Sequence, residues 1–146
     1  MNFEFNENQN DLRAMVRELA EKEIGPRAKE NDEKDVFPVE IYKMMADMGL
    51  TAIGVPEEFG GPEATDIERM IAIEEIAKKD GAVATILAVH GMLIQALVKY
   101  GTDEQKKRFL TRIAEEGYYT AFALTEPGAG SDPASAKTTA VYDAAT

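Results

Sequence analysis

Cysteine and tryptophan are absent from the 146 residues of this chain, and histidine occurs once, as His90. Without cysteine, the chain can form no disulfide, no thiolate nucleophile and no cysteine-ligated zinc site. A single histidine cannot build a site with several imidazole ligands, so we predict no metal centre. The composition is compatible with a reducing compartment, and we expect a cytoplasmic protein.

Basic residues are also scarce, because 16 Lys and Arg stand against 27 Asp and Glu, for a net charge of −11. Such a chain repels phosphate backbones, so we expect no nucleic-acid partner. The acid surplus favours solubility, or a partner with a basic docking face. The first residues, Met1-Asn2-Phe3-Glu4-Phe5, lack the basic and apolar regions of a signal peptide, and their early acid argues against a transit peptide.

Charge is missing altogether from residues 81–98, a stretch whose length reaches the lower limit for a membrane-spanning helix. The stretch is rich in alanine, contains Thr85, His90, Gly91 and Gln95, and has neither an aromatic belt nor a basic flank. We therefore expect no membrane insertion and a helix buried in a bundle. Because it is apolar most of the way round, it should be the central, most buried helix.

Helical periodicity and capping signals predict a mainly α fold, an array of about five helices. The first helix should end or kink at Gly25-Pro26, because proline cannot donate the backbone hydrogen bond, and the charged residues 29–35 should form a solvated turn. The second should open at Phe37-Pro38 and end at Gly49.

Two capping boxes predict the starts of the third and fifth helices, at Thr65 with Glu68 and at Thr102 with Gln105. The fifth helix should end at Gly117. The residues of the third helix expected to face the core are Ile67, Met70, Ile71, Ile73 and Ile76.

After Gly117 the pattern changes, and residues 118–124 are aromatic and β-branched enough for a short strand. A lone strand is not stable, so either more chain follows or the segment packs along the helices. Pro127 would end the strand, because it lacks a ladder donor. Gly128 and Gly130 allow positive φ, so successive amides could converge on an anion.

This loop matches neither of two familiar phosphate-binding motifs. The G-x-G-x-x-G pattern fails because Pro133 stands three residues after Gly130, and the lysine of a P-loop is absent. From the residues alone, two interpretations remain open: a loop that holds a phosphate-bearing cofactor, and an ordinary Gly/Pro turn.

The run Leu124-Thr125-Glu126-Pro127-Gly128-Ala129-Gly130-Ser131-Asp132 resembles the flavin-binding signature of the acyl-CoA dehydrogenase family. Residues 56–61, 74–80 and 100–107 resemble three further stretches of that family, in the same order. The resemblance reaches to about Val141. It implies an N-terminal helical domain over residues 1–117, and over residues 118–146 the beginning of a middle domain that is a β-barrel.

The resemblance implies an oxidoreductase of fatty acid metabolism, a flavoprotein that uses FAD to introduce an α,β double bond into acyl-CoA thioesters. It also implies electron-transfer flavoprotein as the electron acceptor and a homotetramer at full length. The family's catalytic glutamate lies in a downstream bundle, so we expect no catalytic residue in this chain and a truncated or fragmentary enzyme. The alternative is a non-catalytic helical assembly module that retains the flavin loop.

The position of each residue in the signature implies its role. The expected flavin contacts are Phe122, Leu124, Thr125, Gly130 and Ser131. Thr125 would form a hydrogen bond near N5 of the isoalloxazine, and Ser131 would lie between FAD and the acyl-CoA substrate. The signature gives Glu126 a structural place.

The uncharged helix would form part of the acyl-chain wall. Its candidate substrate contacts are Thr85, Ala88, Val89 and Met92, and simple core packing is the alternative for each. No family role applies to His90, which we expect to be a buried or half-buried histidine with satisfied hydrogen bonds.

Overall fold

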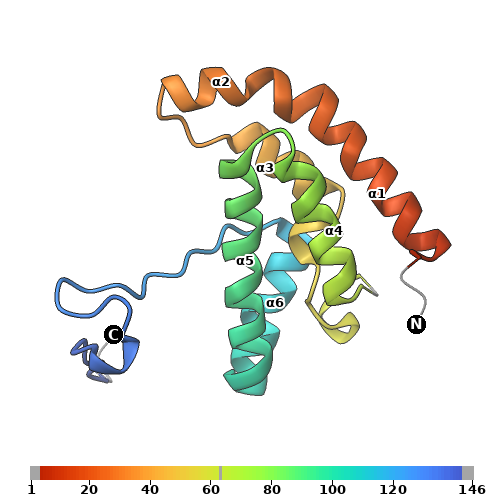
Figure 1. Cartoon of the computed structure of the whole chain (residues 1–146). Helices are drawn as coiled ribbons and strands as arrows, with labels where there is room; N and C mark the ends of the chain where they lie inside the picture. The colour runs from red at the N-terminus through yellow and green to blue at the C-terminus, as the bar shows by residue number, and fades with distance from the viewer. Residues whose placement is uncertain (1–3, 63, 143–146) are drawn as a thin grey trace.

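The computed structural model describes residues 4–62 and 64–142, and in this part the regular structure is helical (Figure 1). Its α-helices are α1 (Glu7–Leu19), α2 (Gly25–Glu33), α3 (Val39–Asp47), α4 (Asp66–Ala77), α5 (Gly81–Tyr100) and α6 (Asp103–Glu116). The predicted mainly α fold is confirmed. The expectations for residues 1–3 and 143–146 lie outside the described residues.

α1 and α2 form one continuous rod, because a π turn at Ala20–Ile24 joins them without a break (Figure 1). Of the predicted end or kink at Gly25-Pro26, the end is wrong, and the irregularity there is the π turn. Of the turn predicted over residues 29–35, only residues 34 and 35 are a turn, because α2 continues to Glu33. A π turn contains one extra residue, which moves the proline ring away from the carbonyl it would meet in a regular α-helix. Pro26 then lies in the first turn of α2, where a missing N–H costs least.

The predicted capping signals are confirmed. Thr65 with Glu68 and Thr102 with Gln105 form reciprocal capping boxes at α4 and α6. Gly49, after α3, and Gly117, after α6, adopt φ values of 75° and 61°. Those left-handed conformations suit glycine because it has no Cβ, so both helices end where the sequence predicts.

α4 packs between α1 and α5, and α5 packs in turn against α6 (Figure 1). The larger cluster of buried side chains fills the space among α1, α3, α4 and α5, and includes Val16, Ile41, Met45, Ile76 and Leu87. A smaller cluster seals α5 against α6 and the loop after α3, and consists of Val55, Ile94, Leu110 and Ile113. Burying each such side chain contributes about 1.5–3 kcal/mol.

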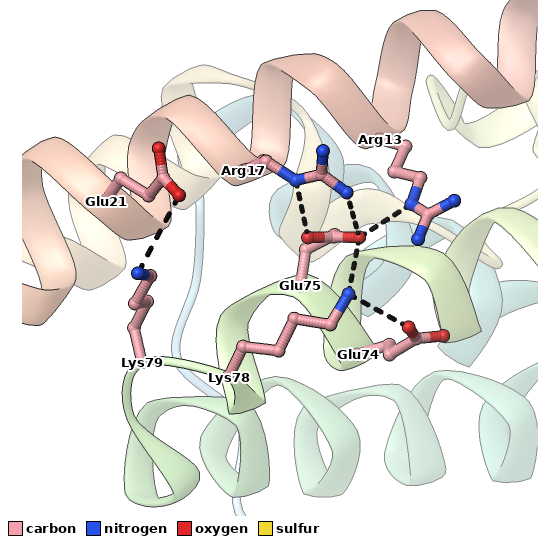
Figure 2. A network of polar contacts seen from close by, with 7 residues as sticks. All are labelled: Arg13, Arg17, Glu21, Glu74, Glu75, Lys78 and Lys79. Atoms are coloured by element: carbon pink, nitrogen blue, oxygen red, sulfur yellow. Dashed lines mark hydrogen bonds and ion pairs between the residues drawn. The ribbon is translucent and has the colours of Figure 1, made fainter.

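A buried carboxylate joins α4 to α1 (Figure 2). The side chain of Glu75 is 2% exposed, and it accepts hydrogen bonds from Arg13 Nε at 2.7 Å, Arg17 Nε and Nη2 at 3.0 Å, and Lys78 Nζ at 2.8 Å. The hydrogen bond from Arg17, followed by those from Lys78 and Arg13, holds the pKa of Glu75 far below its usual range despite its burial. The carboxylate is therefore ionised, and its ion pairs with Arg13 and Arg17 hold α4 against α1.

The core-facing side of α4 differs from the prediction. Ile71 and Ile76 are buried, and Ile73 is half-buried, but Ile67 and Met70 are 54% and 59% exposed. The prediction is wrong for these two residues. α4 packs mainly against α1 and α5, and the exposure of Ile67 and Met70 shows that these neighbours do not cover them.

α5 is buried on one side only. Leu87, His90 and Ile94 are at most 3% exposed, whereas Met92 is 51% exposed. α5 does pack against α4, α6 and the loop after α3, but in the described chain these neighbours cover one side, so its apolar residues are not all buried. By length and a mean hydropathy of 1.9, α5 also passes the test for a membrane-crossing helix, as core helices of soluble proteins do.

Beyond Gly117 the chain leaves the helices and runs to a separate loop (Figure 1). Residues 118–124 form no strand in the described structure, so the short β segment predicted there is not formed. The physical reason is that a strand needs a ladder partner, and among the described residues beyond Gly117 the β-bridge joins Glu126 to Ala129 and does not involve residues 118–124.

Candidate functional site

The point where the chain leaves the helices is organised around His90, on the buried side of α5. Its side chain is 1% exposed, and Nε2 lies 2.8 Å from the carbonyl oxygen of Thr51. That oxygen can only accept, so Nε2 carries the proton and Nδ1 is the acceptor. Nδ1 lies 2.6 Å from Oγ1 of Thr120, and burial lowers the pKa of the imidazole, which keeps it neutral.

Tyr42 of α3 contacts Tyr118 and Tyr119, the two residues before Thr120. Its hydroxyl lies 3.0 Å from the carbonyl oxygen of Tyr118 and donates to it, and its ring stacks on Tyr119 with centroids 4.2 Å apart. Burial raises the pKa of Tyr42 to about 12, so the hydroxyl keeps its proton. Arg112 adds an outer contact, with its guanidinium 4.0 Å from the centroid of the Tyr118 ring.

This junction confirms that His90 is a buried histidine with satisfied hydrogen bonds. Sequence analysis did not identify its partners Tyr42, Thr51 and Thr120, which lie 48, 39 and 30 residues away along the chain. No local pattern could have found them, because residues so far apart meet only through the packing of α3, α5 and the segment after α6.

The loop beyond the junction is closed on itself by Glu126. Its backbone N–H and C=O pair with those of Ala129 at 3.0 and 3.1 Å, which makes a tight turn. Its carboxylate accepts hydrogen bonds from the amides of Lys137 at 2.7 Å and Thr138 at 2.9 Å. These bonds, the one from Lys137 first, lower the pKa of Glu126. The structural place predicted for Glu126 is confirmed.

The glycines of this loop differ from expectation. Neither Gly128 nor Gly130 is among the glycines with positive φ, and the amide of Ala129 is already bonded to Glu126. The amides of Gly128, Ala129 and Gly130 therefore do not converge on one point in the described structure, as the sequence had suggested they could. The turn at Glu126 uses the central amide of the three, which leaves no continuous row of donors.

The residues expected to contact a cofactor lie at the surface. Phe122 and Leu124 are 42% and 47% exposed, and Thr125, Gly130 and Ser131 are exposed as well. The hydroxyls of Thr125 and Ser131 have no hydrogen-bond partner in the part of the chain that the structure describes. The loop thus presents two hydroxyls and two apolar side chains to its surroundings.

The residues expected to form a substrate wall share the open side of α5. Thr85 and Met92 are exposed and Ala88 and Val89 are half-buried, at the i, i+3, i+4 and i+7 spacing of one helix face. They do not meet the loop in this structure, because the loop stands clear of the helices (Figure 1). The two halves of the predicted site are therefore present but apart.

A separate apolar cleft of about 390 Å³ opens beside the junction, between α5, α6 and the segment after α6. It contains none of the predicted site residues. Its lining residues are Leu93, Leu97, Phe109, Arg112, Ile113, Tyr118, Tyr119, Thr120 and Ala121.

Comparison with known proteins places this arrangement in a family. A family model described as "Acyl-CoA dehydrogenase, N-terminal domain" matches residues 6–117. Acryloyl-CoA reductase (NADH) of Anaerotignum propionicum is 47% identical over 146 residues, which are 100% of this chain and 37% of that relative. The chain thus spans less than two fifths of the length of this relative.

Solved structures agree with the sequence match. A chain in a structure described as the electron transferring flavoprotein of Acidaminococcus fermentans has a TM-score of 0.92 and 34% identity, covering 99% of this chain and 38% of that one. Butyryl-CoA dehydrogenase from Megasphaera elsdenii has a TM-score of 0.87 and 30% identity, covering 94% of this chain and 37% of that one. Since the family model covers well over half of the sequence, the chain belongs to the acyl-CoA dehydrogenase family.

Proposed function

We propose that the chain supplies the helical domain and one side of the flavin site of an enzyme that oxidises acyl-CoA thioesters between Cα and Cβ. Residues 1–117 are the helical domain, and residues 118–146 begin a middle β-domain. The observation that carries the proposal is the loop of residues 124–132, which stands clear of the helices with the hydroxyls of Thr125 and Ser131 exposed. Groups that have no partner in the described chain are available to a ligand.

The side chains of the loop fit a flavin by their chemistry. Apart from the adjacent residues, no heavy atom of the described chain lies within 4 Å of the position that a Cβ would take at Gly128 or Gly130, so a ring or phosphate can approach this backbone closely. When bound, FAD supplies the acceptor for the β-hydride. The residues that would hold and orient it are Phe122, Leu124, Thr125, Gly130 and Ser131, with the Thr125 hydroxyl near N5.

The open side of α5 suits an acyl chain. Thr85, Ala88, Val89 and Met92 form a mostly apolar stripe, and an unbranched methionine adapts its shape to an apolar ligand. Ser131 would lie between FAD and the thioester. We assign no catalytic base to this chain, since Glu126 is occupied in closing its own loop.

Identity to the reductase from Anaerotignum, whose name gives NADH as the reductant, supports a second candidate: reduction of an enoyl-CoA at the same site, with NADH as the source of the two electrons. In the first candidate, electrons leave to electron-transfer flavoprotein. We propose that the whole enzyme is a cytoplasmic homotetramer in either case. A non-catalytic assembly module would bind no flavin at all.

Two measurements test the proposal. Titration of FAD onto the 146-residue chain should quench flavin fluorescence, and this quenching should weaken in Thr125→Ala and Ser131→Ala. In the whole enzyme, Thr125→Ala should slow anaerobic flavin reduction by acyl-CoA, through loss of a hydrogen bond that contributes about 1–3 kcal/mol. Unchanged single-turnover reduction would contradict the role of Thr125, and an enzyme that purifies without flavin and takes none up would contradict the proposed function.

A further inference from the structure

We propose that His90 and Thr120 form a positioning lock that sets where the flavin loop leaves the helices, an inference that rests on the proposed function of that loop. The lock is one imidazole between two oxygens. It joins the loop after α3, the buried side of α5 and the segment after α6.

The hydrogen-bond geometry assigns each proton in this cluster. Tyr42 has one hydroxyl proton and two acceptors in reach, the Tyr118 carbonyl at 3.0 Å and His90 Nδ1 at 3.3 Å. The Thr120 hydroxyl lies nearer to Nδ1, at 2.6 Å, and therefore donates to it. Each donor thus has its own acceptor, with Tyr42 bonded to Tyr118 and Thr120 bonded to His90.

The imidazole can hold only one orientation. Rotating the ring would place a C–H group against the carbonyl of Thr51, which would then be buried without its donor. The ring is also fixed from the side by Tyr42, whose ring meets it edge-on with centroids 5.8 Å apart. Since Nδ1 has a fixed position on the helical body, it is a fixed anchor for Thr120.

Thr120 is the last residue of the described chain with a hydrogen bond to the helices, because the bonds after it lie within the loop. Thr125 lies five positions further along the chain, so a fully extended backbone would place it at most about 18 Å from Thr120. Anchoring Thr120 therefore restricts the volume that Thr125 can sample. A loop restricted before the cofactor arrives loses less conformational entropy on binding it, which strengthens binding.

The matched variants are Thr120→Val, which removes the hydroxyl at nearly constant shape, and Thr120→Ser, which restores it. Thr111→Val makes the same change on α6, at a hydroxyl that is not among the hydrogen-bond partners of His90 or Tyr42, and serves as the control. Because the chain has one histidine, its two imidazole ¹⁵N signals in NMR report the lock directly. The heteronuclear NOE of residues 119–125 reports the restriction of the backbone.

In the ligand-free chain, we expect Thr120→Val to move the Nδ1 signal and to lower the NOE of residues 121–125, with Thr120→Ser and Thr111→Val close to wild type. With FAD, Thr120→Val should weaken binding about fivefold, the effect of losing about one net hydrogen bond. An Nδ1 signal that is unchanged in Thr120→Val would overturn the lock. So would wild-type NOE values over residues 121–125 as low as those of residues 127–128, in the turn of the loop.

Failure of the proposed function would look different. In that case wild type takes up no FAD, while the Nδ1 signal and the NOE values still decide whether the lock exists. If wild type and Thr120→Val bind FAD equally well, the flavin site stands and the positioning role of the lock is refuted.

Discussion

Replacing Glu75 by glutamine is the sharpest test of how the helical domain is held together. The substitution keeps the size of the side chain and removes its charge. The carboxylate is 2% exposed and accepts four hydrogen bonds from Arg13, Arg17 and Lys78 (Figure 2). The amide of glutamine keeps one acceptor oxygen and places an NH₂ group against these donors, so α1 loses most of its polar attachment to α4.

The expected loss of stability in Glu75→Gln depends on how exposed the three cationic partners of Glu75 are. A hydrogen bond to a charged group contributes about 1.5–3 kcal/mol, which would overstate the loss if summed over all four. The side chains of Arg13, Arg17 and Lys78 are 35%, 48% and 44% exposed, so they regain water when the carboxylate is gone. We therefore expect Glu75→Gln to lower the free energy of unfolding by about 2–3 kcal/mol.

The assay is urea unfolding followed by circular dichroism at neutral pH. Glu74→Gln is the matched control, because the Glu74 carboxylate is 60% exposed and, within the described residues, forms an ion pair with Lys78 alone. We expect this substitution to lower the free energy of unfolding by less than about 0.5 kcal/mol. The low pKa of folded Glu75 means that its contribution is complete above the ordinary pKa of 4.5 and is lost as the pH falls toward the folded value. The difference between wild type and Glu75→Gln should therefore shrink in acid.

Equal stability of wild type and Glu75→Gln at neutral pH would refute this reasoning. It would mean that the cost of burying the Glu75 carboxylate cancels its attraction to the three cations. A difference that persists unchanged into acid would also contradict it, because the effect would then come from packing and not from charge.

Three further predictions concern other sites. A Cβ added at Gly61 would lie 1.8 Å from the backbone oxygen of Val55, so we expect Gly61→Ala to lower the free energy of unfolding by about 3 kcal/mol in the same urea assay. The control is Gly81→Ala, where the added Cβ would enter open space, and we expect a change of less than about 0.5 kcal/mol. Glu126→Gln should speed tryptic cleavage at Lys137 without changing the thermal unfolding of the helices; an equal cleavage rate would contradict the closed loop. Burial lowers the pKa of His90 in the folded state. Wild-type stability should therefore rise with pH, by at most about 1.4 kcal/mol per pH unit, until the unfolded state loses its proton near about 6.5. His90→Gln should remove this rise in the same assay.

Local signals in the sequence predicted the ends of most helices. The capping boxes at Thr65 and Thr102 and the glycines at 49 and 117 all act within one helical turn, so they need no tertiary partner. Of the end or kink predicted at Gly25-Pro26, the end was wrong because a π turn, a rare local structure, accommodates the proline ring. The strand predicted after Gly117 is not formed, because a strand depends on a ladder partner and the described residues place none beside residues 118–124.

The side of each helix that is buried was harder to predict. An apolar residue on a helix is equally consistent with a core position and with an exposed binding surface, and Ile67, Met70 and Met92 proved exposed. Conversely, a buried glutamate such as Glu75 carries no mark in the sequence, since it depends on cations that come from α1.

The sequence by itself determined the helical order, the caps and the loop of residues 124–132 that resembles a flavin signature, because each depends on neighbours a few positions away. Only the tertiary structure decided that His90 holds Thr120, that Glu75 pins α1 to α4, and that the loop stands clear of the open side of α5. The first two of these features join residues 30 to 62 positions apart, and no local pattern can specify such a contact. The physical reason is that packing, and not spacing along the chain, brings their atoms within hydrogen-bond distance.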